Sequence, residues 1–287
     1  MTQIPKRIFY VWGANEDKKR DVNLCLLSWH QKMPDYEIIE INENSTEYFN
    51  FQEELKKNKY FRMVYDRKMY ACVADYIRIK TLYDNGGIYF DTDVCALKTL
   101  DEFLDEPAFV GIEGTKETIG KDWVEPAILG AQKGNLFLKK IVEFYENDIL
   151  KTPLFILPDI FMKFLREIYN VEEFPPKEKQ EIIKLNDITI YPEKYFIPYR
   201  LNEKFSIDCI EPKTCTIHLW NGSWNNSDIR FFQEHKHKYP LWLLDRLIVL
   251  RHFLNWIFKI NNQQRRNLKI KYIQILGLKF IISKKKI

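Results

Sequence analysis

The stretch DNGGIYFDTDV, residues 84–94, decides the fold of this chain. Two glycines end a helical pattern, a short apolar run typical of a strand follows, and two aspartates close it. If the strand continued through them, Asp91 and Asp93 would project to the same face, because side chains alternate along a strand. Two carboxylates on one face repel each other unless a cation lies between them. The pattern fits either a solvated strand end or a site for a hard divalent cation such as Mg²⁺ or Mn²⁺.

Around this stretch, strand-like and helical patterns alternate. We predict strands at 7–12, 36–41 and 108–114, and helices at 21–33, from the following segment to about Tyr83, and near 135–148, with Asp21 as the cap of the first helix. This alternation predicts a layered α/β domain with a largely parallel sheet. Ligands of such sheets bind at the carboxyl ends of the strands, which is where Asp91 and Asp93 stand.

Composition indicates one large domain or one domain with an appendage. The chain has 287 residues, 46% hydrophobic and 15% aromatic, which is enough for a full core. Five cysteines without a CxxC pair suggest free thiols in a reducing compartment. The opening MTQIPKRIFYVWG lacks the features of a secretory signal, and no uncharged apolar run approaches the roughly 18 residues of a spanning helix. We therefore expect an intracellular protein.

The charge is divided unevenly along the chain. The net charge is +4, but the eleven Lys and Arg of residues 246–287 stand without any Asp or Glu, which leaves 4 − 11 = −7 for residues 1–245. We predict a main α/β domain over 1–238, with a helical excursion at about 150–213, and an amphipathic basic region over 239–287.

The segment ACVADYIRIKTLYDNGGIYFDTDV (71–94) resembles the signature of the glycosyltransferase family 32-like, DXD-containing sugar transferases, which include bacterial capsule and lipopolysaccharide enzymes. Three further segments match in the same order: IPKRIFYVWG (4–13), SWHQKMPDYEI (28–38) and HLWNGSW (218–224). The likeness covers roughly residues 4–230. It implies a GT-A type α/β fold and a metal-dependent, retaining transfer of a hexose or N-acetylhexosamine from a UDP-sugar.

The resemblance assigns the cation to three residues. A divalent ion, Mn²⁺ or Mg²⁺, would hold the donor diphosphate and stabilise the leaving group. Asp93 is the stronger ligand candidate, and Asp91 would contact donor hydroxyls and reach the metal through water. His218 stands where related enzymes complete the metal shell, although an isolated histidine is also an ordinary structural residue.

The resemblance also assigns donor contacts, each with a structural alternative. Trp12 would stack on the base, or else pack in the core. Asp75 and Arg78 would touch the transferred sugar and phosphate, whereas spacing alone suggests a weak surface ion pair between them. Tyr89 matches a donor-contacting position and is equally suited to the core.

Two segments complete the implied site. Ser223 and the catalytic candidate Trp224 belong to a loop that would close over the diphosphate and exclude water. The segment WVEPAILGAQKG (123–134) departs from the family pattern, because Glu125-Pro126 stands about where relatives often carry an acceptor-side Asn. Acceptor contacts therefore do not carry over there, although Glu125 itself is a candidate to approach the acceptor hydroxyl.

Two other functions remain as alternatives. Haloacid-dehalogenase-type phosphatases also place DxDx[TV] after an apolar strand, but usually on the first strand of the fold and with a later acidic pair, which is missing here. A non-catalytic membrane-surface adapter is the second alternative, and the intact DTD with His218 and Trp224 argues against it. No nucleic-acid partner is expected.

The expected reaction is a front-face displacement, in which the departing diphosphate oxygen takes the acceptor proton. Sequons at Asn221 and Asn225 lie inside the closing loop, where a glycan would obstruct it, so we expect a bacterial cytoplasmic enzyme. Its acceptor would be a saccharide, such as a polyprenyl-diphosphate-linked one in capsule or lipopolysaccharide synthesis.

The basic region interleaves bulky apolar residues with cations in YPLWLLDRLIVLRHFLNWIFKI (239–260). One interpretation is a helix packed on the catalytic domain with a short basic hairpin beyond it. The other is a peripheral anchor on the inner face of the plasma membrane, with an apolar face in the headgroup boundary and cations near anionic lipid.

Overall fold

The computed structural model describes residues 3–201, 203–221, 227–265, 268–275 and 278–286. The chain divides into two compact units, one of Met1–Leu150 with Leu154–Asn225 and one of Lys151–Pro153 with Asn226–Ile287. Each unit is described by itself below.

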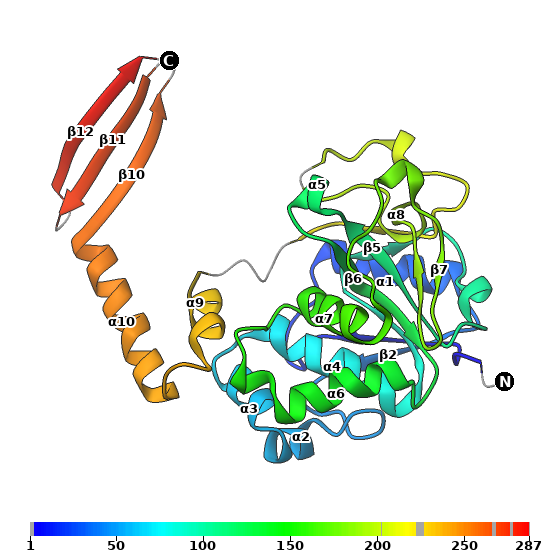
Figure 1. Ribbon diagram of the computed structural model, residues 1–287. Coiled ribbons are helices and arrows are strands. Elements are labelled where there is room, and N and C mark those ends of the chain that lie inside the picture. Colours follow the sequence, from blue (N-terminus) through cyan, green and yellow to red (C-terminus); the bar gives the residue numbers. More distant parts are fainter. Residues whose placement is uncertain (1–2, 202, 222–226, 266–267, 276–277, 287) are drawn as a thin grey trace. The chain divides into compact units, whose positions relative to one another are not determined.

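A seven-stranded sheet forms the centre of the first unit in the part of the chain that the structure describes (Figure 1). Its strand order is β2 (Glu37–Ile41), β1 (Arg7–Val11), β3 (Gly87–Phe90), β6 (Trp123–Ala131), β5 (Ala108–Gly114), β8 (Thr189–Tyr191) and β7 (Ile183–Lys184). The pairings give β2, β1, β3, β5 and β8 one direction and β6 and β7 the other. The predicted α/β fold with a largely parallel sheet is therefore confirmed.

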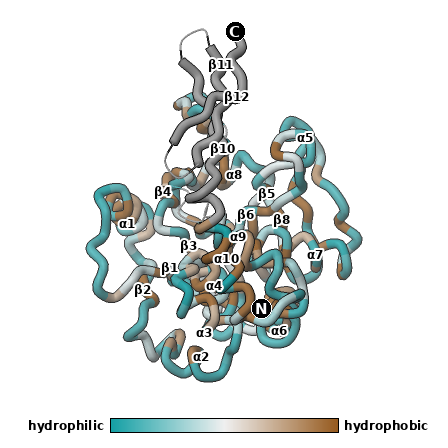
Figure 2. Tube along the Cα trace, turned by 90° about the vertical axis from the view of Figure 1, so that its left-hand side faces the viewer, coloured by the Kyte–Doolittle hydropathy of each residue, from teal (hydrophilic) through white to brown (hydrophobic). Residues whose placement is uncertain are grey.

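Helices cover the sheet because its strands are apolar on both faces. Figure 1 shows α4 (Tyr70–Asn85), α6 (Leu136–Asn147) and α7 (Leu157–Tyr169) together on one side. On the other side, Trp29 of α1 (Arg20–Lys32) contacts Phe90 of β3 edge to face, with ring centroids 5.2 Å apart. The Trp29 indole also donates to the carbonyl of Val94 at 2.7 Å, which fixes the chain just after the two aspartates. Figure 2 shows hydrophilic residues mainly on the peripheral loops of this unit.

The long helical segment before the glycines is three helices rather than one. These are α2 (Phe51–Lys57), α3 (Lys59–Asp66) and α4. The side chains of Asn50 and Asn58 accept from backbone N–H groups of α2 and α3, and such caps start a new helix. The predicted cap at Asp21 is wrong, because Lys19 holds the cap position and Asp21 lies in the first turn of α1. The predicted stop is confirmed: α4 ends at Asn85, and Gly86 follows with a φ of 68°.

Short elements complete the first unit. They are β4 (Val94–Ala96), β9 (Thr216–His218), α5 (Lys116–Ile119), α8 (Glu193–Phe196) and the 3₁₀ turns Asp101–Phe103, Lys177–Lys179 and Ile207–Cys209. A further 3₁₀ turn, Ile149–Lys151, spans the point in the sequence where the first unit gives way to the second. The five cysteines all lie in described segments and are free thiols, as predicted.

The second unit contains α9 (Ser227–His235), α10 (Leu241–Ile257) and a three-stranded antiparallel sheet of β10 (Phe258–Arg265), β11 (Leu268–Ile275) and β12 (Leu278–Lys286). The basic region thus has one strand more than the hairpin suggested by its sequence. Among the described residues, no helix combines the length and the apolar character that a bilayer crossing requires.

Candidate functional site

The site forms where two parallel strands and one antiparallel strand meet at the same edge of the sheet. β1 and β3 are parallel, with Phe9 opposite Tyr89, so their carboxyl ends lie side by side. β6 runs the other way, so its first residues reach this edge. The backbone N–H of Asp91 donates to the carbonyl of Ala127 in β6 at 2.9 Å, which fixes the position of Asp91.

The two aspartates stand in a turn rather than in a continued strand. β3 ends at Phe90, and the N–H of Val94 donates back to the carbonyl of Asp91 at 3.0 Å. The alternation argument from the sequence is therefore wrong in its geometry. The turn nevertheless brings both carboxylates to one side, as the sequence predicted.

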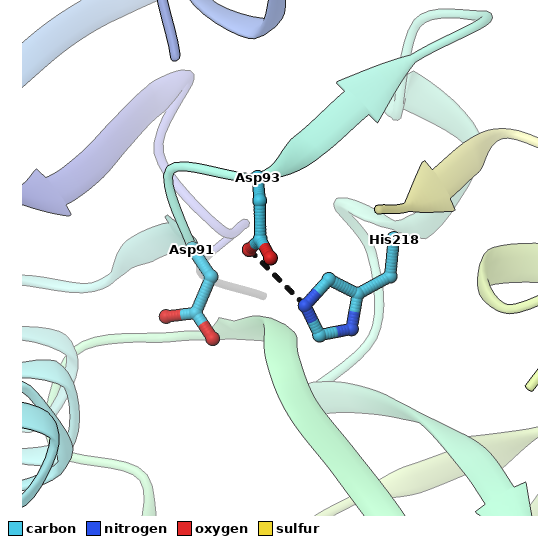
Figure 3. A group of neighbouring side chains, drawn as sticks. All are labelled: Asp91, Asp93 and His218. Carbon is cyan, nitrogen blue, oxygen red and sulfur yellow. Dashed lines mark hydrogen bonds and ion pairs between the residues drawn. The ribbon is translucent and has the colours of Figure 1, made fainter. Parts of the chain in front are cut away.

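A distant segment brings the third member of the site. β4, which follows the turn, pairs with β9 and places Val94 opposite His218. Asp93 is held at both carboxylate oxygens. His218 Nε2 lies 3.1 Å from Oδ1 (Figure 3). The N–H of Asn221 donates to Oδ2 at 2.8 Å. One potential ligand atom each from Asp91, Asp93 and His218 lies within 4.8 Å of the other two.

The donor set fits a divalent cation. Carboxylate oxygens suit Mg²⁺ and Mn²⁺, and an imidazole nitrogen favours the transition metal of the two. A cation among these atoms would relieve the repulsion between Asp91 and Asp93. The three residues predicted as metal ligands are thus brought together.

Neighbouring groups shift the pKa values of Asp93 and His218 in opposite directions. Burial acts to raise the pKa of Asp93, but the hydrogen bonds from His218 and from the Asn221 N–H outweigh it and hold this pKa below its usual value. Burial acts to lower the pKa of His218, yet Asp93 and Glu125 raise it to about 10. A cation that binds Nε2 must replace any proton on that nitrogen.

Arg78 compensates the charge beneath the turn. Its Nη2 lies 2.6 Å from Asp91 Oδ1 and 3.7 Å from Asp75 Oδ1, and its guanidinium lies 4.4 Å from the centroid of the Tyr89 ring. Arg78 is only 5% exposed, so the pair is buried and differs from the weak surface pair that spacing alone suggested. Burial raises the pKa of Asp75 to about 7 although Arg78 opposes this. Tyr89 is buried in β3 under the guanidinium.

Glu125 lies beside His218. It is 8% exposed, its Oε1 accepts from the N–H of Ala127 at 2.9 Å, and its Oε2 lies 3.7 Å from His218 Nδ1. The predicted approach of Glu125 to an acceptor hydroxyl stays a prediction.

Three further residues were predicted to bind the donor: Trp12, Ser223 and Trp224. Trp12 follows β1 at the same sheet edge, packs partly against the core, and donates from its indole to the carbonyl of Glu16 at 2.7 Å. Its stacking on a base stays a prediction. Ser223 and Trp224 lie outside the described residues.

Sequence reasoning missed Trp220 and the backbone of Asn221. The Trp220 ring lies 4.2 Å from the His218 ring, and its φ of 57° is rare for a residue other than glycine. Strained backbone of this kind occurs mostly at functional sites. Both residues stand inside the matched HLWNGSW segment, so the signal was present but pointed to its later residues.

Part of this site lies in a segment of the chain that matches a known protein-family model. Residues 19–110 match the family model of the glycosyltransferase sugar-binding region containing the DXD motif. That range includes Asp75, Arg78, Tyr89 and both aspartates of the turn, whereas His218 lies beyond it.

Individual proteins are similar to parts of this chain at low or moderate sequence identity. Inositol phosphoceramide mannosyltransferase 3 of Schizosaccharomyces pombe is 31% identical over 140 residues, which are 48% of this chain and 36% of the relative, so the chain spans about a third of that relative. Among solved structures, PaToxG glycosyltransferase is similar at 19% identity and a TM-score of 0.45, over 58% of this chain and 71% of that one. Glycosyltransferase GlyE of Streptococcus pneumoniae is similar at 7% identity and a TM-score of 0.42, over 87% and 64%.

Proposed function

We propose that this chain is a family 32-like DXD-containing glycosyltransferase and that it transfers a hexose or N-acetylhexosamine from a UDP-sugar to a saccharide acceptor; the match of residues 19–110 to the DXD sugar-binding region supports this. The observation that carries the proposal is the convergence of Asp91, Asp93 and His218 within 4.8 Å at the edge of the sheet. These residues would hold Mn²⁺ or Mg²⁺, which supplies Lewis-acid stabilisation of the leaving diphosphate.

The residues of the chain bind and orient the donor in this mechanism. Asp91 and Asp93 supply the oxygen ligands, and Arg78 keeps Asp91 in place through the 2.6 Å ion pair. Asp75, whose Oδ1 lies 3.7 Å from Arg78 Nη2, would accept a hydrogen bond from a hydroxyl of the donor sugar. Trp12 stands at the same edge, at the end of β1, and would stack on the base.

The proposed reaction is a single displacement at the anomeric carbon. The bond between the anomeric carbon and the diphosphate oxygen breaks, and a new bond forms from the acceptor hydroxyl oxygen on the same face. The acceptor proton passes to the departing diphosphate oxygen, so the products are the glycosylated acceptor and UDP, with the configuration retained. Trapping of a stable glycosyl-enzyme adduct by mass spectrometry would contradict this mechanism.

The test is a donor panel with and without Mn²⁺. UDP-galactose, UDP-glucose, UDP-N-acetylhexosamines and GDP-mannose are compared by thermal shift and by release of nucleoside diphosphate. GDP-mannose is included because the fission-yeast relative is named as a mannosyltransferase. We expect a UDP-sugar to stabilise the protein and to be hydrolysed slowly only with Mn²⁺; a response to GDP-mannose alone would refute the UDP assignment.

A matched pair of variants separates the site from general effects of charge. Asp93→Asn is expected to abolish Mn²⁺-dependent hydrolysis, because it removes a ligand charge. Asp66→Asn, at the exposed end of α3, removes the same charge elsewhere and should leave it unchanged. Equal activity of the two variants would exclude the proposed cation site. Hydrolysis of p-nitrophenyl phosphate would favour the phosphatase alternative, and no turnover of any donor would favour the adapter.

We also propose that the enzyme works at the inner face of a bacterial plasma membrane on a lipid-linked acceptor, in capsule or lipopolysaccharide synthesis. Support comes from the eleven cations without an acid in residues 246–287 and from exposed apolar residues on α10, among them Trp242 and Val249 at 60% and 68%. Apolar residues beside cations are typical of interfacial helices, and each cation near anionic lipid contributes about 1 kcal/mol.

Vesicle co-sedimentation tests this location. The full chain is expected to sediment with phosphatidylglycerol vesicles at low salt, less at high salt, and little with neutral vesicles. Substitution of both Trp242 and Val249 by Glu should abolish sedimentation without lowering donor hydrolysis. Equal sedimentation of this variant and the wild type would contradict the proposal, and N-glycans on protein from its native host would contradict the cytoplasmic location.

A further inference from the structure

The imidazole of His218 lies between two carboxylates, that of Asp93 in the turn after β3 and that of Glu125 on β6. Its Nε2 lies 3.1 Å from Asp93 Oδ1, while its Nδ1 lies 3.7 Å from Glu125 Oε2. The ring is 7% exposed, and Nδ1 has no hydrogen-bond partner among the described residues. A buried polar atom without such a partner is costly, so this arrangement needs a reason.

Glu125 is held so that one oxygen remains available. Its Oε1 accepts from the N–H of Ala127, and the carbonyl of the same Ala127 accepts from the N–H of Asp91. Pro126 restricts the backbone between them, since its ring fixes φ. One peptide segment of β6 therefore positions both the first aspartate of the DXD turn and the carboxylate that faces His218.

We propose that Glu125 is a positioning residue, which orients His218 for cation binding by accepting a hydrogen bond from Nδ1. A histidine that ligates a metal through one nitrogen almost always donates its other N–H to a carboxylate, carbonyl or water, and this fixes the tautomer and the ring orientation. The present 3.7 Å is an ion-pair distance; a contraction of about 0.7 Å gives an ordinary hydrogen bond. This inference rests on the proposed cation site.

The primary measurement is Mn²⁺ affinity, read from the electron paramagnetic resonance signal of free Mn²⁺ during titration. Glu125→Gln is expected to weaken binding about 10- to 100-fold, the usual cost of losing such a partner. Glu125→Asp should restore part of the affinity, because it keeps the charge on a shorter side chain. Thermal unfolding without Mn²⁺ verifies that each variant is folded.

Glu113→Gln is the matched control. Glu113 stands on the neighbouring strand β5, and the substitution changes a carboxyl to an amide of the same size, as Glu125→Gln does. We expect the Mn²⁺ affinity of this variant to stay within twofold of the wild type.

A double-mutant cycle decides whether Glu125 acts through His218. In a His218→Ala background, Glu125→Gln should have no further effect on Mn²⁺ affinity, whereas an effect that persists there overturns the inference. Equal affinity of Glu125→Gln and the wild type also overturns it while leaving the proposed function intact. If the wild type binds no Mn²⁺, the proposed cation site fails and this inference fails with it.

Discussion

Replacement of Arg78 by Gln is the most direct test of how this site balances its charge. Arg78 is 5% exposed and lies 2.6 Å from Asp91 and 3.7 Å from Asp75, whose side chains are 29% and 19% exposed. Removal of one partner of a buried ion pair costs about 3–5 kcal/mol. Because Asp91 retains some contact with water, we take the lower end, about 3 kcal/mol. This corresponds to a Tm lower by about 6–12 °C for a unit of this size.

The loss should depend on pH in a definite direction. Burial raises the pKa of Asp75 from 3.8 to about 7, and Arg78 opposes this rise. The native protein therefore keeps a proton that the unfolded chain has released, so this carboxyl lowers stability as the pH rises from about 4 through about 7. Burial also raises the pKa of Asp91 against Arg78. In Arg78→Gln the pKa values of both Asp75 and Asp91 rise further. The loss of stability caused by this substitution is therefore smallest near pH 4–5, where both carboxyls are protonated most, and largest near pH 8.

The assay is thermal unfolding by circular dichroism at pH 5 and pH 8, with Lys80→Gln as the control. Lys80 pairs with Asp84 at 2.8 Å on the same helix, but Asp84 is 40% exposed, and such i,i+4 pairs contribute about 0.3–0.5 kcal/mol. If Arg78→Gln loses no more than Lys80→Gln at pH 8, or if its loss grows toward acid, the account of the buried charges is wrong.

Two further predictions concern stability alone. A Cβ at Gly130 would lie 2.1 Å from Cε1 of the buried Phe109. Gly130→Ala should therefore lower the free energy of unfolding by about 1–3 kcal/mol in urea, with partial recovery in a Phe109→Leu background. An unchanged free energy of unfolding would show that the core can accommodate the added methyl group. Arg200 lies 2.6 Å from the fully buried Glu193, so Arg200→Gln should lower the free energy of unfolding by about 3 kcal/mol or more at pH 7. Glu203→Gln removes the more exposed partner of Arg200 and should lower it by less than about 1 kcal/mol. Equal losses in the two variants would show that the buried pair is not the stronger one.

Local patterns predicted most of the first unit and half of its site. The apolar runs ending at Val11 and Phe90 and the glycine stop after Asn85 have local causes, and the structure places these features as expected. The position of His218 near the DXD turn followed from the resemblance, because no local pattern pairs β4 with a strand more than a hundred residues later.

The position of Glu125 beside His218 could not be predicted because it depends on strand direction. A parallel β6 would have carried its first residues to the opposite edge of the sheet, away from Asp91. Hydrophobic pattern fixes the existence of a strand but not its direction, so Glu125 appeared as a residue near the acceptor rather than beside His218. The three helices before Gly86 were merged for a related reason: the capping role of Asn58 depends on side-chain geometry.

The pairing of β4 with β9 has a consequence for the order in which the protein is made. Ribosomes release the chain from its amino end, and Asp93 lies 125 residues ahead of His218 and 128 ahead of Asn221. A nascent chain that has completed the whole DXD region, residues 19–110, still lacks both His218, at the end of β9, and Asn221, which together hold the two carboxylate oxygens of Asp93. The proposed cation site therefore arises only when β9 and the residues that follow it have been synthesised and β9 has paired with β4.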